Sequence, residues 1–194
     1  PIDEKHILNP INYYGFTKMI IEKQLLWYSR LKNINIACLR YFNAAGYDIK
    51  GRIMEKEKNP QNLLPLVMEV ANNTRKNLEV YGDDYDTDDG TCIRDYIHVN
   101  DLAIAHIKSI KALDKHNNLI LNLSTGLSYS VLDVINATEK ITGLSIPYKI
   151  VDRRLGDPDK LYATSNEAKS ILNWEPKFSD LDIIIDSMWK VYKK

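Results

Sequence analysis

Hydrophobic residues recur at three- and four-residue spacing over residues 12–32, and this period predicts an amphipathic helix. The run that follows, INIACLRYF at residues 34–42, is short and rich in β-branched and aromatic side chains. Such a run is typical of a largely buried strand. A helix followed by a buried strand favours an α/β architecture.

Helices and strands alternate along the rest of the chain. Apolar periods and flanking cap residues predict further helices over residues 62–72, 101–113, 131–143, 166–172 and 179–192. Asn100 or Asp101 is expected to be the N-cap of the helix that ends at residue 113. Short apolar or alternating runs predict strands over residues 78–82, 91–99, 119–124 and 147–151. The loops are expected at residues 43–52, 83–90 and 153–159.

The composition narrows the class of protein. Lys plus Arg and Asp plus Glu each number 26, so no basic field favours nucleic acid or an anionic membrane. No apolar run could span a bilayer, and no apolar signal segment is visible. Cys38 and Cys92 are therefore expected to be reduced thiols in a cytoplasmic protein. The chain starts at Pro1 in loop-like sequence, which favours a piece of a longer polypeptide.

The stretch NPINYYGFTK, residues 9–18, contains a candidate acid/base. Tyr14 and Lys18 are four residues apart and share a helix face, whereas Tyr13 shares its face with Thr17. An ammonium group beside a phenol stabilises the phenolate, which can take a proton from a sugar hydroxyl and return it. Because Tyr28 and Lys32 repeat this spacing, the pattern alone also fits a packing tyrosine beside a solvated lysine. Tyr14 is the better candidate because it lies at the helix start, next to loops.

Longer motifs carry a family resemblance over nearly the whole chain. The segments NPINYYGFTKMIIEKQL, ACLRYFNAAG, YGDDYDTDDGTCIRDYIHVNDLA, NLSTGLSYSVLDVINA and RRLGDPDKLYA resemble the second half of an extended short-chain dehydrogenase/reductase. Within that family they are most similar to the NAD-dependent epimerases of UDP-hexoses. The resemblance implies the rear part of a Rossmann-type NAD-binding domain plus a smaller α/β domain for the sugar nucleotide. The first comprises residues 1–43, with 93–114 packing back on it, and residues 44–92 and 115–194 belong mainly to the second.

The resemblance also implies the chemistry. Tyr14 would take the proton from the sugar 4-hydroxyl while hydride passes between C4 and NAD, and Lys18 would hold the nicotinamide ribose. Tyr41 and Phe42 would lie beside the nicotinamide, although either could instead be a packing residue at a strand end. The expected pair of substrates is UDP-glucose and UDP-galactose.

The residues that would bind the UDP-sugar are spread over five segments. Arginines suit this role because the guanidinium fork matches phosphate oxygens. Arg94 could instead pair with Asp95 or another surface acid, and Arg154 could be one of several solvated loop charges. The resemblance assigns substrate contacts to Asn43, Asn62, Leu63, Glu79, Val80, Tyr81, Arg94, Arg154 and Asp157. Leu161 would set the pocket size. Its intermediate bulk favours UDP-glucose and UDP-galactose and does not decide whether N-acetylated sugars are accepted. His6, His106 and His116 lack ligand spacing, so no metal site is expected.

Three features that the family places upstream of residue 9 are missing from the sequence. The chain has no G-x-G-x-x-G loop, no upstream acidic ribose ligand and no upstream Ser/Thr partner for the tyrosine. We therefore expect little NAD binding and no turnover from these 194 residues alone, and a homodimer for the complete protein. Two alternatives stay open: a sugar-nucleotide 4,6-dehydratase or decarboxylase of the same family, and a non-catalytic module that binds UDP-sugars.

Overall fold

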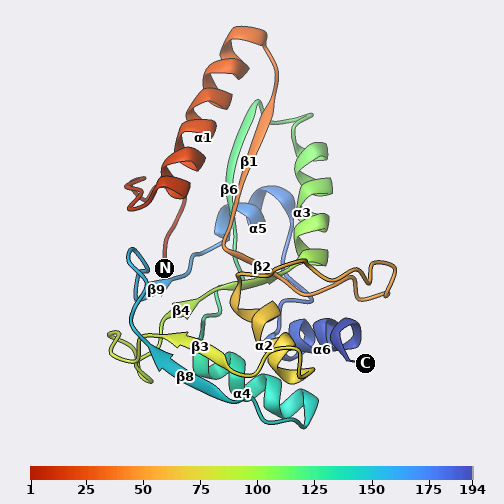
Figure 1. The fold of residues 1–194 in the computed structure, drawn as a ribbon. Helices are drawn as coiled ribbons and strands as arrows, with labels where there is room; N and C mark the ends of the chain where they lie inside the picture. The colour runs from red at the N-terminus through yellow and green to blue at the C-terminus, as the bar shows by residue number, and fades with distance from the viewer. Residues whose placement is uncertain (194) are drawn as a thin grey trace.

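The computed structural model describes residues 1–193 and has two regions joined by short strands (Figure 1). In the first region, two parallel strands lie between a long helix and a shorter one. Ile36 is in register with Asn118 and Tyr41 with Leu123 along this pair. The elements are α1 (Tyr13–Lys32), β1 (Ile36–Tyr41), α3 (Val99–Ala112), β6 (Asn118–Leu123) and α5 (Asn166–Leu172).

In the second region three helices pack on one another, and one of them, α2, also contacts a two-stranded parallel sheet (Figure 1). Its elements are α2 (Leu63–Ala71), β3 (Leu78–Tyr81), α4 (Val131–Thr142), β8 (Tyr148–Val151) and α6 (Leu181–Tyr192). Val67, Val134 and Ile184 are fully buried where the three helices meet. A separate hydrophobic cluster in the first region joins α3, β6 and α5 around Trp174. Residues 115–193 therefore contribute to both clusters.

Short strands connect the two regions. β2 (Asn43–Ala45) pairs in parallel with β5 (Tyr96–His98). A three-stranded sheet places β4 (Ile93–Arg94) between β7 (Tyr129–Ser130) and β9 (Lys160–Leu161). The chain thus passes from one sheet to the other at Asp95, between β4 and β5.

Local sequence signals account for the helix ends. The Asn12 side chain accepts a hydrogen bond from the Gly15 N–H at 2.8 Å and starts α1. Ser130 and Asp133 form a capping box at the start of α4, and Gly143 ends that helix with φ 70°. All predicted helices are confirmed, with ends shifted by no more than two residues.

Four expectations about the local structure were wrong. Residues 91–99 form two short strands rather than one, and part of the 43–52 segment is strand β2. The N-cap of α3 is His98, whose Nδ1 accepts from the Asn100 N–H at 3.0 Å, because Asp101 binds the segment 177–179 instead. In β1 only Ile36 is buried, because β1 pairs with β6 alone among residues 1–193.

No helix within residues 1–193 combines the length and the apolar character that a bilayer crossing requires.

Candidate active site

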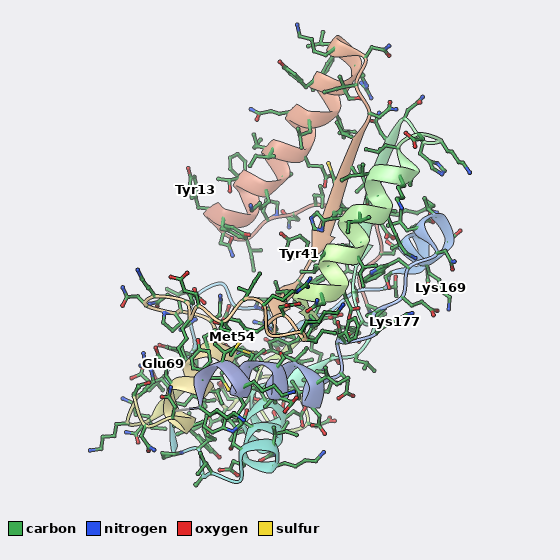
Figure 2. The ribbon with its side chains drawn as sticks, turned by 90° about the vertical axis from the view of Figure 1, so that its right-hand side faces the viewer. Tyr13, Tyr41, Met54, Glu69, Lys169 and Lys177 are labelled. Carbon is green, nitrogen blue, oxygen red and sulfur yellow. The ribbon has the colours of Figure 1, made fainter. Side chains whose placement is uncertain are left out.

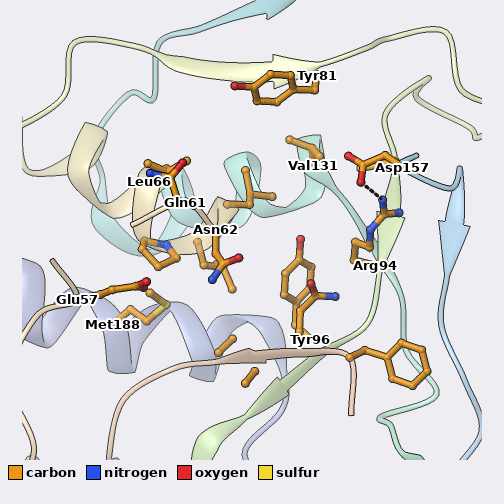
Figure 3. Close-up of a pocket in the computed structure, with 18 of the residues that line it drawn as sticks. Glu57, Gln61, Asn62, Leu66, Tyr81, Arg94, Tyr96, Val131, Asp157 and Met188 are labelled. Atoms are coloured by element: carbon orange, nitrogen blue, oxygen red, sulfur yellow. Dashed lines mark ion pairs between the residues drawn. The ribbon is translucent and has the colours of Figure 1, made fainter. Parts of the chain in front are cut away.

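A cleft of about 610 Å³ opens between the two regions, bordered by β2, the start of α2, β3 and β4 (Figure 3). Most of the residues predicted from the sequence to form a site line this one cleft, although they come from widely separated segments. They are Tyr14, Phe42, Asn43, Asn62, Leu63, Glu79, Val80, Tyr81, Arg94, Arg154 and Asp157.

Three predicted site residues lie outside the cleft lining. Lys18 is one turn further along α1, and its Nζ lies 5.1 Å from the centre of the Tyr14 ring. Tyr41 ends β1 and packs edge-on against the ring of His106 at 6.3 Å between centroids. Leu161 is in register with Arg94 across β9 and β4. Lys18 therefore reaches the cleft only through Tyr14.

Tyr14 stands in the first turn of α1, at the mouth of the cleft. Its side chain is 70% exposed, so the phenol is open to a ligand from the cleft and from the solvent side. The helix that carries it is tied to β1 by Arg40, which forms a double ion pair with Glu22 at 2.9 and 2.6 Å. Both side chains are largely buried, and such bidentate pairs give geometric specificity. Arg40 thus sets the position of α1 relative to β1.

Arg94 is held on the cleft wall by main-chain acceptors and by an ion pair with Asp157, which Figure 3 shows as a dashed line. Its Nη1 donates to the carbonyl of Pro158 at 2.8 Å and to that of Ile93 at 2.9 Å. Its Nη2 lies 3.6 Å from Oδ1 of Asp157, and the side chain is 12% exposed. These contacts use one side of the guanidinium, so its remaining donors can serve an anion in the cleft.

Arg154 and Tyr81 form a stacked pair that also lines the cleft. The guanidinium carbon of Arg154 lies 3.8 Å from the centre of the Tyr81 ring, a cation–π contact. The Tyr81 hydroxyl donates to Glu79 at 3.1 Å, and Lys149 pairs with Glu79 at 2.8 Å. The hydrogen bond from Lys149, followed by that from Tyr81, lowers the pKa of Glu79. An aromatic face, a carboxylate and an arginine are thereby brought together.

The start of α2 contributes main-chain donors to the cleft. Asn62 is the N-cap residue, and the cleft is lined by Asn62, Leu63 and Leu64 in succession. The first N–H groups of a helix have no partner within the helix and favour an anion. The Asn62 amide makes no capping hydrogen bond, so it too can serve a ligand.

Sequence reasoning missed several residues that line the cleft, among them Tyr96, Cys92 and Glu57. Tyr96 is 5% exposed and directs its hydroxyl into the cleft (Figure 3). Burial raises the pKa of Tyr96 and of the Cys92 thiol. A signal was available, because alternation along 91–99 puts Cys92 and Tyr96 on the same face as Arg94.

Residues 1–124 match the NAD dependent epimerase/dehydratase family. The match covers more than half of the chain, and the chain belongs to this family. The α/β class and the resemblance to NAD-dependent epimerases expected from the sequence are confirmed.

Several similar proteins are UDP-glucose 4-epimerases. That of Halalkalibacterium halodurans is 44% identical over 195 residues, which is 100% of this chain and 58% of the relative. The crystal structure from Brucella ovis in complex with NAD has a TM-score of 0.94 at 44% identity, covering 99% of this chain and 59% of that one. The structure from Bifidobacterium longum in complex with NAD+ and UDP has a TM-score of 0.92 at 41% identity, covering 98% and 58%. This chain thus spans about 58% of the length of the first relative.

Proposed function

We propose that this chain is the rear part of a longer polypeptide that interconverts UDP-glucose and UDP-galactose by transient oxidation at sugar C4, with NAD as cofactor. One observation carries the proposal. A tyrosine with a lysine against its ring opens into the same cleft as two arginines and a helix start. The arginines and the helix start suit a diphosphate anion, and the tyrosine with its lysine suits proton transfer at a sugar hydroxyl.

The cleft offers a distinct group to each part of a UDP-sugar. Arg94, Arg154 and the start of α2 would bind the diphosphate, since guanidinium forks and helix N-termini favour phosphate oxygens. Glu79, Val80 and Tyr81 would flank the uracil, and Asp157 would bind the ribose hydroxyls. Asn43 and the buried Tyr96 hydroxyl would meet the diphosphate or the sugar.

The residues beside β1 fit one end of NAD. Tyr14, Lys18, Tyr41 and Phe42 would hold the nicotinamide and its ribose, and both Tyr14 and Tyr41 are open for that contact. No glycine-rich loop occurs in the sequence, so these 194 residues lack the usual binding site for the pyrophosphate of NAD. Bound NAD supplies a hydride acceptor. Tyr14 takes the proton of the sugar 4-hydroxyl on Oη and returns it, and the Lys18 ammonium stabilises the phenolate.

The preferred sugar is a hexose without an N-acetyl group. Leu161 is intermediate in size and lies outside the cleft lining, in register with Arg94 on the neighbouring strand, so it would limit the pocket from beside Arg94. Robust turnover of UDP-N-acetylglucosamine, at a rate that rivals UDP-glucose, would contradict this preference.

We further propose a division into an NAD-binding part, residues 1–43 with 93–114, and a mainly UDP-sugar-binding part. A homodimer through α1 is supported by apolar residues that face away from the rest of the fold. Tyr13, Trp27 and Leu31 are each more than 60% exposed, and Figure 2 shows Tyr13 directed outward. A cytoplasmic location is supported by the free thiols of Cys38 and Cys92.

The test is a matched pair of substitutions in the complete polypeptide. Tyr14→Phe removes the proposed acid/base, whereas Tyr28→Phe removes the same hydroxyl from the other Tyr-x-x-x-Lys pair. We expect conversion of UDP-galactose to UDP-glucose to fall by about 10² or more for Tyr14→Phe and to stay within about twofold for Tyr28→Phe. Equal activity of both variants would contradict the assignment.

Product analysis of the unmodified protein separates the other functions. A 4-keto-6-deoxy sugar would identify a dehydratase, and loss of carbon dioxide from UDP-glucuronate would identify a decarboxylase. UDP binding without any turnover would identify a binding module. We expect the 194 residues alone to give no NAD-dependent turnover.

A further inference from the structure

Asp95 is a carboxyl group with no exposed surface, at the point where the chain passes from β4 into β5. Its Oδ2 lies 2.5 Å from Oγ of Ser124, just after the end of β6. The Thr125 N–H donates to both carboxyl oxygens at 3.3 and 3.2 Å, and Thr125 Oγ1 lies 3.1 Å from Oδ1. Asp95 is absent from the cleft lining, so any role in the site runs through other residues.

The hydrogen atoms around Ser124 decide the protonation state of Asp95. Oγ of Ser124 accepts from the Gly126 N–H at 3.1 Å and lies 2.6 Å from the carbonyl of Ala163. A hydroxyl has one hydrogen, and a main-chain carbonyl can only accept. If Ser124 donates to Ala163, its contact with Asp95 requires a hydrogen on the carboxyl. A protonated Asp95 satisfies all three contacts, whereas a carboxylate leaves two acceptors to share one hydrogen.

The environment of the carboxyl agrees with this count. The pKa of Asp95 is raised, because its burial outweighs the opposing effect of the hydrogen bonds at Ser124 and Thr125. A buried carboxylate without a cation is strongly disfavoured, and such groups take up a proton instead.

The main chain of Asp95 touches two predicted substrate residues. Its carbonyl accepts from the Asn43 N–H at 3.1 Å and from the Asn43 side-chain amide at 2.9 Å. Its N–H donates to the carbonyl of Leu161 at 3.3 Å, and Arg94 is the preceding residue. Because the side chain is anchored at the end of β6, the carboxyl fixes this bend relative to the β1–β6 pair.

We propose that Asp95 is a positioning residue for the sugar-nucleotide site, a neutral carboxylic acid that donates to Ser124 and thereby sets Asn43 and Arg94 in their places. The proposal deepens the proposed function and rests on it in assigning Asn43 and Arg94 to the substrate. Asparagine has the same shape and can donate to Ser124 while accepting from Thr125. Alanine can do neither.

The experiment compares Asp95→Asn with Asp95→Ala in the complete polypeptide. We expect Asp95→Ala to weaken UDP binding, measured by calorimetry, and to raise KM for UDP-galactose about tenfold or more, with a smaller fall in kcat. We expect Asp95→Asn to stay within about threefold of the unmodified protein in each. Asp88, an exposed aspartate of the preceding turn, provides the control, and Asp88→Ala should change neither quantity.

An infrared difference spectrum between the unmodified protein and Asp95→Asn, taken at pH 7, reports the proton directly. A carbonyl band of a protonated carboxyl group that is present only in the unmodified protein is expected, and its absence would overturn the neutral acid. If Asp95→Asn and Asp95→Ala lost UDP binding equally, the site would need a charged carboxylate at this position. If neither variant lost UDP binding, Asp95 would have no positioning role. Both outcomes contradict the proposal. The spectrum and UDP binding do not depend on turnover, so a failure of the epimerase assignment would be recognised separately.

Discussion

Replacement of Arg94 by lysine tests whether the geometry of its guanidinium, and not only its charge, serves the substrate. The carbonyls of Ile93 and Pro158 hold Nη1, and Asp157 lies beside Nη2. A lysine ammonium holds its three donors on one nitrogen, so it cannot reproduce the planar guanidinium fork that reaches both carbonyls on one nitrogen and presents other nitrogens to a phosphate oxygen.

The size of the effect follows from the contact that is lost. A hydrogen bond to a charged group contributes about 1.5–3 kcal/mol net. Since about 1.4 kcal/mol corresponds to a factor of ten in affinity, Arg94→Lys should weaken UDP binding about 10- to 100-fold. Arg94→Ala should weaken it further, because the positive charge is lost as well.

The assay is calorimetric titration of the complete polypeptide with UDP. Arg153→Lys is the matched control, because Arg153 lies in the adjacent loop and pairs with Asp84 and the Tyr85 ring without lining the cleft. We expect the control to bind UDP within about twofold of the unmodified protein. If folded Arg94→Lys and Arg94→Ala proteins also bound UDP that well, Arg94 would have no part in diphosphate recognition.

Three further predictions concern stability, measured as the free energy of unfolding in denaturant. Burial lowers the pKa of His98, so the folded protein keeps this ring neutral where the unfolded chain protonates it below about pH 6.5. The stability that the neutral ring contributes is present above that pH and is lost as the pH falls. The difference in free energy of unfolding between the unmodified protein and His98→Asn should therefore shrink by up to about 1.4 kcal/mol per pH unit. A difference that stays constant with pH would refute this. Asp101→Ala leaves the N–H groups of Lys177 and Phe178 and the buried hydroxyl of Ser179 without their acceptor, and we expect a loss of about 3 kcal/mol. The exposed Asp114→Ala should stay within about 0.5 kcal/mol. Gly46→Ala would put a Cβ 2.6 Å from Cδ2 of His98 at φ 82°, for a loss of about 2–4 kcal/mol, and Gly126→Ala, with similar φ and nothing within 4 Å, should lose only about 1 kcal/mol. Equal losses at the two glycines would mean that the contact with His98 does not matter.

The interval between Cys92 and His98 shows how far sequence reasoning reached into the site. Alternating side chains identified extended backbone, and the family motif singled out Arg94 as a phosphate ligand. The break at Asp95 was not predictable, because β4 and β5 are two and three residues long and exist only through partners elsewhere in the chain. The same reason explains why β2, β7 and β9 were missed.

Some contacts among the cleft residues were likewise predictable from the sequence, and others were not. The i,i+4 spacing alone placed Lys18 beside Tyr14, because helix geometry decides that contact. The stacking of Arg154 on Tyr81 joins residues more than seventy positions apart, and no local pattern indicates it.

The sequence by itself determined the helices, the glycine that ends α4, the Tyr–Lys pair and the family, because periodicity, helix-ending glycines and motif wording are local properties of the chain. Only the tertiary structure decided that Asp101 binds residues 177–179 and leaves the helix cap to His98, and that Asp95 is enclosed by Ser124 and Thr125. Burial and hydrogen-bond partners from distant segments determine what a polar side chain does, and those partners meet only when the chain has folded.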